Sequence, residues 1–168
     1  MNRTVLISTY QPVFVGNNEA EIEDAKTVLL QHKLWAAKED ILVIRGDFNV
    51  HVGGGENRPG ICGRFGIRQS NQQGLDLLAW CEENDLAHIN SFYSHKRRGT
   101  WFHPALGRWY EIDGFLMRQE QRHANVKKIS TVGESSISDH KAQTQETNFG
   151  KKMEEIQQRR KQNKNTQN

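Results

Sequence analysis

A short, continuous apolar run, Ile41-Leu42-Val43-Ile44, constrains the fold more than any other feature of the sequence. A strand with apolar residues at every position suits a sheet that is covered on both faces. The run is followed abruptly by Gly46 and then by polar residues. The sequence therefore predicts a buried strand whose carboxyl end opens into a polar segment.

Strand-like and helix-like segments alternate around this run. The loosely alternating residues 4–10 predict a strand. Asn17 or Asn18 can cap a helix that runs to about Ala37, and Ser70 or Asn71 can cap a second helix. Further strands are expected at residues 87–92, 100–102, 109–117 and 126–132. This alternation is typical of an α/β or α+β fold, and 168 residues fit one domain.

The composition is polar for a globular domain, with 35% hydrophobic residues and a mean hydropathy of -0.80. No apolar run is long enough to span a bilayer, and the first residues become polar too quickly for a signal peptide. We therefore expect no membrane partner and an intracellular location. Cys62 and Cys81 lack metal-ligand spacing, so we expect free thiols with no disulfide partner.

The net charge of +3 is concentrated at the end of the chain. From Lys151 onward there are six basic and two acidic residues, which leaves 17 basic and 18 acidic residues before that point. Overall basicity is therefore a poor indicator of a nucleic-acid-binding surface on the fold. We expect one domain over residues 1–147 and a basic polar tail over residues 148–168, either a frayed helix or disordered.

The first polar cluster is Gly46-Asp47-Phe48-Asn49, at the end of the predicted buried strand. Ligands of open α/β folds gather at strand ends. Asp47 and Asn49 are two residues apart, so their side chains point to the same side of an extended backbone. A carboxylate and an amide there could deprotonate and hold a water molecule or bind a phosphate oxygen. The alternative is an ordinary turn capped by the Asp and Asn side chains.

Two further segments place a carboxylate near a histidine. Ser138-Asp139-His140 offers a metal ligand beside a titratable imidazole, or else it is a solvated surface turn. Asp113 lies in an apolar strand, where a carboxylate is costly unless it is paired. We expect His140 to be its partner, because a carboxylate that accepts from one ring nitrogen fixes the tautomer. The alternative places Asp113 on the exposed face of an edge strand.

Two loops could contact a ligand. The segment from His51 to Gln69 is long and rich in glycine, which in a compact domain indicates function or disorder. The basic run His95-Lys96-Arg97-Arg98 could contact DNA phosphates, or it could be a solvated loop. The sequence alone does not separate these alternatives.

The motifs Tyr10-Gln-Pro, Gly-Asp-Phe-Asn, Thr-Trp, Ile-Asp and Ser-Asp-His occur in this order along the chain. The order resembles the endonuclease/exonuclease/phosphatase superfamily, whose members include DNase I-like and abasic-site nucleases. The resemblance is closest to endonuclease domains of non-LTR retrotransposons and to craniofacial development protein 2-like sequences. Residues 60–66, 100–104 and 109–113 carry that closer resemblance, and the match covers roughly residues 4–140.

The resemblance implies an α/β (α+β) fold, namely the C-terminal portion of a DNase I-like four-layered α/β/β/α sandwich. It also implies that Mg²⁺ or Mn²⁺ assists the hydrolysis of a DNA phosphodiester by an activated water. The expected metal ligands in this chain are Asp139 and Asp47.

The same resemblance implies roles for individual side chains. Asp47 corresponds to the residue that acts as the base or positions the water. His140 stabilises charge on the phosphoryl oxygens, and Asp113 orients it. Tyr10 and Asn49 contact the substrate phosphate together with His140. Fixed donors of this kind, with a hard cation, neutralise charge as it grows in the transition state.

The superfamily's first half supplies an Asn and the Glu that is its principal metal ligand. No residue of this sequence precedes Met1 to supply either, so we expect a truncated domain that lacks this Glu and is inactive alone. The polar residues 141–148 stand where the family has an apolar closing strand, so we expect that strand to be lost.

Two functions follow from the resemblance. The first is a metal-dependent DNA endonuclease of retrotransposon type, associated with a reverse transcriptase and located in the nucleus rather than the cytoplasm. The second is a catalytically inactive remnant that acts as a nucleic-acid-binding or interaction module. Neither the preferred DNA site nor the oligomeric state is indicated by the sequence.

Overall fold

The computed structural model describes residues 3–56, 58–132 and 139–147. The predicted tail and Ser138 lie outside the described residues. The elements are, in chain order, β1 (Thr4–Tyr10), α1 (Glu19–Leu34), β2 (Ile41–Asp47), α2 (Gln72–Glu83), β3 (Leu86–His88), η1 (Ile89–Phe92), β4 (Trp101–His103), η2 (Pro104–Leu106), β5 (Arg108–Tyr110), β6 (Asp113–Arg118), η3 (Gln119–Gln121), α3 (Arg122–Asn125), β7 (Val126–Thr131) and β8 (Gln143–Thr147).

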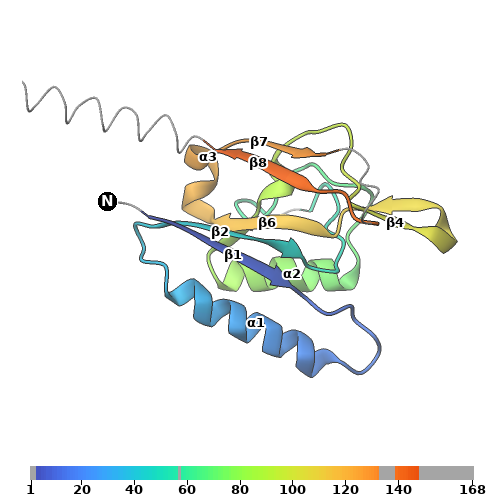
Figure 1. Ribbon diagram of the computed structural model, residues 1–168, viewed down its shortest axis with the longest axis horizontal. Coiled ribbons are helices and arrows are strands. Elements are labelled where there is room, and N and C mark those ends of the chain that lie inside the picture. Colours follow the sequence, from blue (N-terminus) through green and yellow to red (C-terminus); the bar gives the residue numbers. More distant parts are fainter. Residues whose placement is uncertain (1–2, 57, 133–138, 148–168) are drawn as a thin grey trace, which may run out of the picture.

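A four-stranded sheet in the order β1-β2-β6-β3 forms the centre of the molecule (Figure 1). β1 and β2 are parallel, with α1 as their crossover, and β2 pairs with β6 in the antiparallel sense. The register aligns Tyr10 with Asp47 and Asp47 with Asp113. The carboxyl ends of β1 and β2 and the start of β6 therefore lie together at the same end of the sheet.

Both faces of the central sheet are covered, as the apolar run in β2 predicted. Leu42 and Ile44 pack with residues of α1 and α2, whereas Val43 packs with residues of β7 on the other face. Figure 1 shows α1 and α2 on one side of the sheet and the β7–β8 pair on the other. Burial of each such aliphatic side chain stabilises the fold by about 1.5–3 kcal/mol. The expected α/β class is thus confirmed, with layers of helix, sheet and sheet.

A glycine is required where β1 and β2 approach each other most closely. A Cβ atom on Gly46 would lie 1.9 Å from the carbonyl oxygen of Thr9, so no other residue fits without moving the backbone. This contact brings the end of β1 against the residue that precedes Asp47.

The prediction of a single strand over residues 109–117 was wrong, because the chain forms two strands, β5 and β6, and the two residues between them belong to neither. The buried hydroxyl of Thr100 accepts hydrogen bonds from the backbone N–H groups of Ile112 (3.1 Å) and Asp113 (3.2 Å), and this redirects the chain. The strand expected over residues 87–92 also stops early, at His88. The Ser91 hydroxyl donates to the His88 carbonyl (2.6 Å), which favours the short helix η1.

The expectation that residues 141–148 had lost their strand was also wrong. β8 pairs with β7 in the antiparallel sense, and its polar side chains find partners in place of an apolar face. Gln145 Nε2 lies 3.2 Å from the sulfur of Met117, and Gln143 Nε2 donates to Glu111 Oε1 at 3.3 Å. Backbone pairing and side-chain hydrogen bonds therefore maintain a strand that hydrophobic patterning does not reveal.

The first helix ends at Leu34 rather than near Ala37. The N–H groups of Trp35 and Ala36 bond to carbonyls three residues back, and Asp40 Oδ2 accepts from the N–H of Ala37 at 3.1 Å. These contacts tighten the last turn and close the helix. In the parts of the chain that the structure describes, no helix is long and apolar enough to cross a membrane.

Candidate catalytic and metal site

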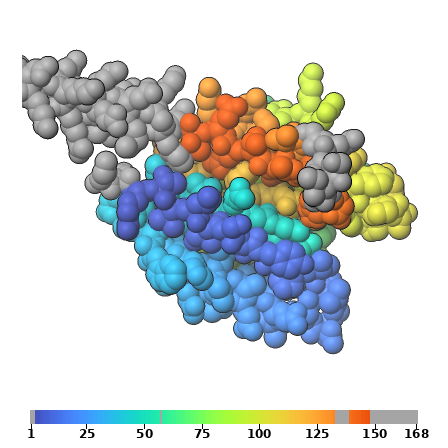
Figure 2. All heavy atoms as spheres, in the orientation of Figure 1, coloured from blue at the N-terminus to red at the C-terminus, as the bar shows by residue number. Residues whose placement is uncertain are grey.

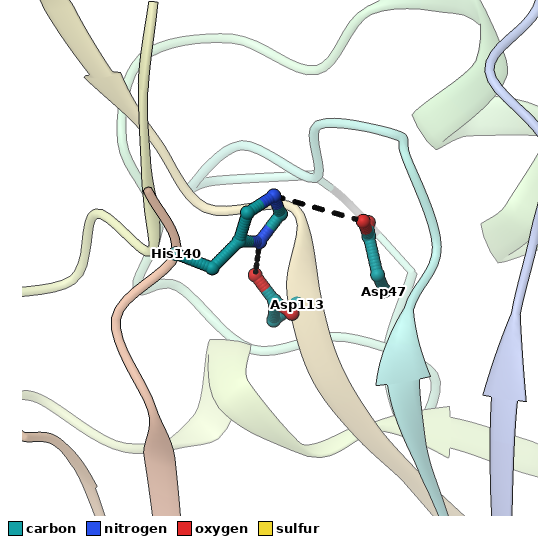
Figure 3. A group of neighbouring side chains, drawn as sticks. All are labelled: Asp47, Asp113 and His140. Atoms are coloured by element: carbon teal, nitrogen blue, oxygen red, sulfur yellow. Dashed lines mark hydrogen bonds and ion pairs between the residues drawn. The ribbon is translucent and has the colours of Figure 1, made fainter. Parts of the chain in front are cut away.

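Asp47, Asp113 and His140 converge at the polar edge of the central sheet (Figure 3). Asp47 ends β2 and lies directly opposite Asp113, the first residue of β6. His140 Nδ1 is 2.9 Å from Asp113 Oδ2, and His140 Nε2 is 3.9 Å from Asp47 Oδ2. The predicted pairing of Asp113 with His140 is therefore present. When Asp113 is ionised, it accepts the Nδ1–H and leaves Nε2 facing Asp47.

The turn after β2 fixes the carboxylate of Asp47. The N–H of Asn49 donates to Asp47 Oδ1 at 2.8 Å, and Asn49 has a left-handed backbone with φ of 51°. Asn49 Nδ2 also donates to the carbonyl oxygen of Gln11 at 2.8 Å, which ties the end of β1 to this turn. The sequence left two interpretations of residues 46–49, a functional cluster or an ordinary turn capped by its Asp and Asn side chains. The turn is present, and it orients Asp47 toward His140.

Burial raises the pKa of Asp47 above the ordinary range of an aspartate. The negative charge of Asp113 acts in the same direction, whereas the N–H of Asn49 and the charge of His140 act against it. A carboxyl group with a raised pKa is a stronger base once it is ionised. Asp47 is thus suited to accept a proton from a water molecule.

Thr100 holds the other two members of the cluster in place. Besides binding the N–H groups of Ile112 and Asp113, its carbonyl oxygen accepts from the N–H of Lys141 at 2.6 Å. A backbone bridge also joins Trp101 to His140. The start of β6 and the segment that carries His140 are therefore both anchored to Thr100.

The ligand atoms of Asp47, Asp113 and His140 all lie within 4.8 Å of one another, so the described residues contain a possible metal site. Carboxylate oxygens suit Mg²⁺, and the added imidazole suits Mn²⁺ as well. Asp139, predicted as a ligand, is next to this group but outside it. Its Oδ2 accepts from Trp101 Nε1 at 3.1 Å, and its role as a ligand remains a prediction.

A cleft of about 1020 Å³ adjoins the cluster. Asp47, Asn49 and His140 line it together with Tyr10, whose side chain is largely exposed. Trp101, which belongs to the Thr-Trp motif, also lines the cleft, together with residues to which the sequence assigned no role: His51, Arg68, His103 and Tyr110. The available signal for two of them was the glycine-rich loop, because His51 and Arg68 lie at its two ends.

The basic run at residues 95–98 was expected either to contact DNA phosphates or to be a solvated loop. Neither expectation describes Arg98, which is engaged within the protein. The side chain of Arg98 is only 10% exposed, and its Nε donates to the buried Glu111 Oε2 at 2.9 Å. Asn90 and Gln143 donate to the other oxygen of Glu111, at 2.9 and 3.3 Å. This buried network connects the run to η1 and β8, and sequence reasoning did not find it because its members are far apart in the chain.

Known proteins resemble the chain in sequence over part of its length and in fold. No protein-family model matches the chain. Craniofacial development protein 2 of Bos taurus is 38% identical over 116 residues, which cover 67% of this chain. The corresponding protein of Tragulus javanicus shows the same identity over the same length. The chain spans about a fifth of the length of these relatives (19% and 20%).

Solved structures of nucleases have the same fold. A 3'-5' exonuclease from Neisseria meningitidis aligns with 84% of this chain and 60% of its own, with a TM-score of 0.58 and 16% identity. An AP endonuclease from Archaeoglobus fulgidus aligns with 86% of this chain and 62% of its own, with a TM-score of 0.57 and 12% identity. A 3' phosphatase from Neisseria, solved with product DNA hairpin, aligns with 85% of this chain and 60% of its own, with a TM-score of 0.57 and 16% identity.

Proposed function

We propose, from the premise that this chain has part of the DNase I-like fold of the endonuclease/exonuclease/phosphatase superfamily, that it forms the centre of a divalent-metal-dependent DNA endonuclease. The observation that carries the proposal is the cluster of Asp47, Asp113 and His140 beside a cleft. A positioned base, an oriented imidazole and nearby carboxylates are the groups that phosphodiester hydrolysis by water requires.

In this proposal Asp47 accepts a proton from the attacking water, because burial gives it a raised pKa and Asn49 fixes its orientation. His140 is held through Nδ1 by Asp113 and directs Nε2 toward the phosphoryl oxygens. Tyr10 and Asn49, which also line the cleft, contact the substrate phosphate.

The residues present can hold a divalent cation through the carboxylate of Asp47, with Asp113 or Asp139 beside it. When bound, the cation supplies charge neutralisation at the phosphoryl oxygens. The choice of Mg²⁺ or Mn²⁺ and the use of Asp139 as a ligand are parts of the proposal.

DNA as the substrate is supported by the structural similarity to a phosphatase solved with product DNA. The retrotransposon type of the domain, its association with a reverse transcriptase and a nuclear location are further proposals. They rest on the resemblance carried by residues 100–104 and 109–113.

The second candidate function is a nucleic-acid-binding module without catalysis. One observation favours it: Asp113 is engaged with His140 and Asp47 Oδ1 accepts from the N–H of Asn49, so few carboxylate oxygens of the cluster are left to hold a cation. Mg²⁺ bound by so few protein oxygens would be weakly held.

Plasmid nicking by the purified chain separates the two candidates. The enzyme proposal requires, against the expectation from sequence that the chain alone is inactive, that the chain nicks supercoiled DNA with Mg²⁺ or Mn²⁺, stops with EDTA, and loses the activity in His140→Ala. His123→Ala, outside the cluster and the cleft, is the matched control and should nick normally. A soluble, folded chain that binds DNA but never nicks it would leave only the binding module.

A further inference from the structure

We propose that Arg68 is a phosphate-binding residue that holds the nucleic-acid backbone in the cleft beside the cluster of Asp47, Asp113 and His140. The inference rests on the proposed function and names a contact for its substrate. It starts from a sequence feature that the catalytic cluster leaves unexplained, the glycine-rich loop between His51 and Gln69.

Contacts join the two ends of this loop. The N–H of Gly54 donates to the carbonyl of Arg68 at 3.1 Å, and the N–H of Gly53 donates to the Ser70 hydroxyl at 2.9 Å. A Cβ atom on Gly53 would lie 2.5 Å from the carbonyl oxygen of Arg68, so the two backbones touch. The imidazole of His51 contacts the carbonyl oxygen of Ile67.

These contacts hold Arg68 in an unusual backbone conformation. Its φ is 60°, in the left-handed region that non-glycine residues rarely adopt. Such conformations persist where the surroundings enforce them, and they concentrate at ligand-binding sites. Here the enforced conformation places the side chain of Arg68 along the wall of the cleft.

The guanidinium group of Arg68 is positioned but has no polar partner in the protein. Its Cζ lies 5.5 Å from the centre of the Tyr110 ring, and within the described residues no hydrogen bond or ion pair engages the side chain. Among the described residues that line the cleft, Arg68 is the only lysine or arginine. It therefore supplies the permanent positive charge of this wall.

A guanidinium that lies over an aromatic ring keeps the N–H donors in its plane available. Those donors match the geometry of phosphate oxygens and can bind two of them at once. In the proposed function the cluster binds the phosphate that is cleaved. Arg68 lines the same cleft and would hold a neighbouring phosphate of the same strand.

Binding of a fluorescein-labelled DNA duplex in EDTA, measured by anisotropy at several KCl concentrations, tests this role without catalysis. Arg68→Gly is the informative variant, because glycine accepts a φ of 60° and should preserve the loop, which its melting temperature checks. Arg68→Lys keeps the charge but not the planar fork. Lys38→Ala removes one exposed positive charge at the opposite end of β2 and serves as the control.

We expect Arg68→Gly to bind about tenfold more weakly and its salt slope to fall by about 0.9, the loss of one phosphate contact. Arg68→Lys should recover most of the slope, and Lys38→Ala should match the unaltered chain. An Arg68→Gly variant with unchanged affinity and slope overturns the inference, as does a folded chain that does not bind DNA.

The nicking assay decides the proposed function separately. A chain that nicks DNA, but whose Arg68→Gly variant binds as tightly as before, overturns the role of Arg68 alone. A chain that depends on Arg68 for binding, but never nicks DNA with a metal ion, overturns the proposed hydrolysis and leaves the role of Arg68 standing.

Discussion

Asp47 and Asp113 lie directly opposite each other across the antiparallel strands β2 and β6, and both carboxylates face the imidazole of His140. Like charges at opposed positions of a sheet destabilise it. The pair is tolerated because the imidazole lies between the carboxylates and the turn at Asn49 donates to one of them. Together with burial, which has the larger effect, the opposed charge of Asp113 raises the pKa of Asp47.

Asp47→Asn should stabilise the fold at neutral pH and abolish nicking. Because the pKa of Asp47 is raised in the folded state, its carboxyl favours folding at low pH, and this contribution is lost as the pH rises through the folded pKa. The difference in unfolding free energy between variant and unaltered chain should therefore grow from acidic to neutral pH. Urea unfolding across this range measures it, with the exposed Asp76→Asn as control. A constant difference would contradict the account.

Asp113→Asn should lower the nicking rate by about 10- to 100-fold while the chain stays folded. The substituted amide no longer carries the charge that fixes the Nδ1–H tautomer of His140. Nitrogen chemical shifts of His140 should report a change of tautomer in the same variant. An unchanged rate, or a slower rate with an unchanged tautomer, would argue against an orienting role for Asp113.

Glu111→Gln should destabilise the fold by about 3–5 kcal/mol, because it leaves the buried charge of Arg98 without its partner. The exposed pair of Arg58 and Glu82 offers a matched comparison, since Glu82→Gln should cost about 1 kcal/mol or less. Denaturant unfolding of both variants gives the comparison. A similar loss of unfolding free energy in Glu111→Gln and Glu82→Gln would show that the network around Glu111 contributes no more stability than an exposed ion pair.

Acid should destabilise the fold through His88. Burial lowers the pKa of this imidazole to about 3, so below pH 6.5 the unfolded chain binds a proton that the folded chain resists. Stability should then fall by about 1.4 kcal/mol per pH unit as the pH decreases from 6.5 toward 3. His88→Gln should remove this part of the slope in urea unfolding experiments. If the free energy of unfolding of His88→Gln still falls as steeply with decreasing pH, the pH dependence must arise from another titratable group.

The sequence predicted the parts of the fold that local patterns encode. The strand at residues 4–10, the buried strand through Ile44 and the Asn71 cap of α2 follow from alternation, apolar continuity and capping chemistry. The break between β5 and β6 could not be predicted, because it depends on the hydroxyl of Thr100, ten or more residues away. β8 was missed because backbone pairing and amide hydrogen bonds replace an apolar face there.

The candidate site was also predicted only in part from the sequence. The pairing of Asp113 with His140 followed from the cost of a lone carboxylate in an apolar strand. The opposition of Asp47 to Asp113 needed the β2–β6 register, which no local pattern specifies. The contact between the Arg68 guanidinium, on a loop, and the Tyr110 ring, on a hairpin, could not be predicted, because it depends on how the two segments pack in the folded chain. Figures 1 and 2 show that hairpin, β4–β5, standing out at one end of the molecule.

The most direct test of the central claim is a titration of the chain with Mn²⁺, in which electron paramagnetic resonance reports the free ion. If Asp47, Asp113 and His140 form a divalent-metal centre, the unaltered chain should bind one ion, and Asp47→Asn should lose that binding. Asp76→Asn should bind as the unaltered chain does. Equal binding by Asp47→Asn and the unaltered chain would contradict the account, because the ion would then be held elsewhere.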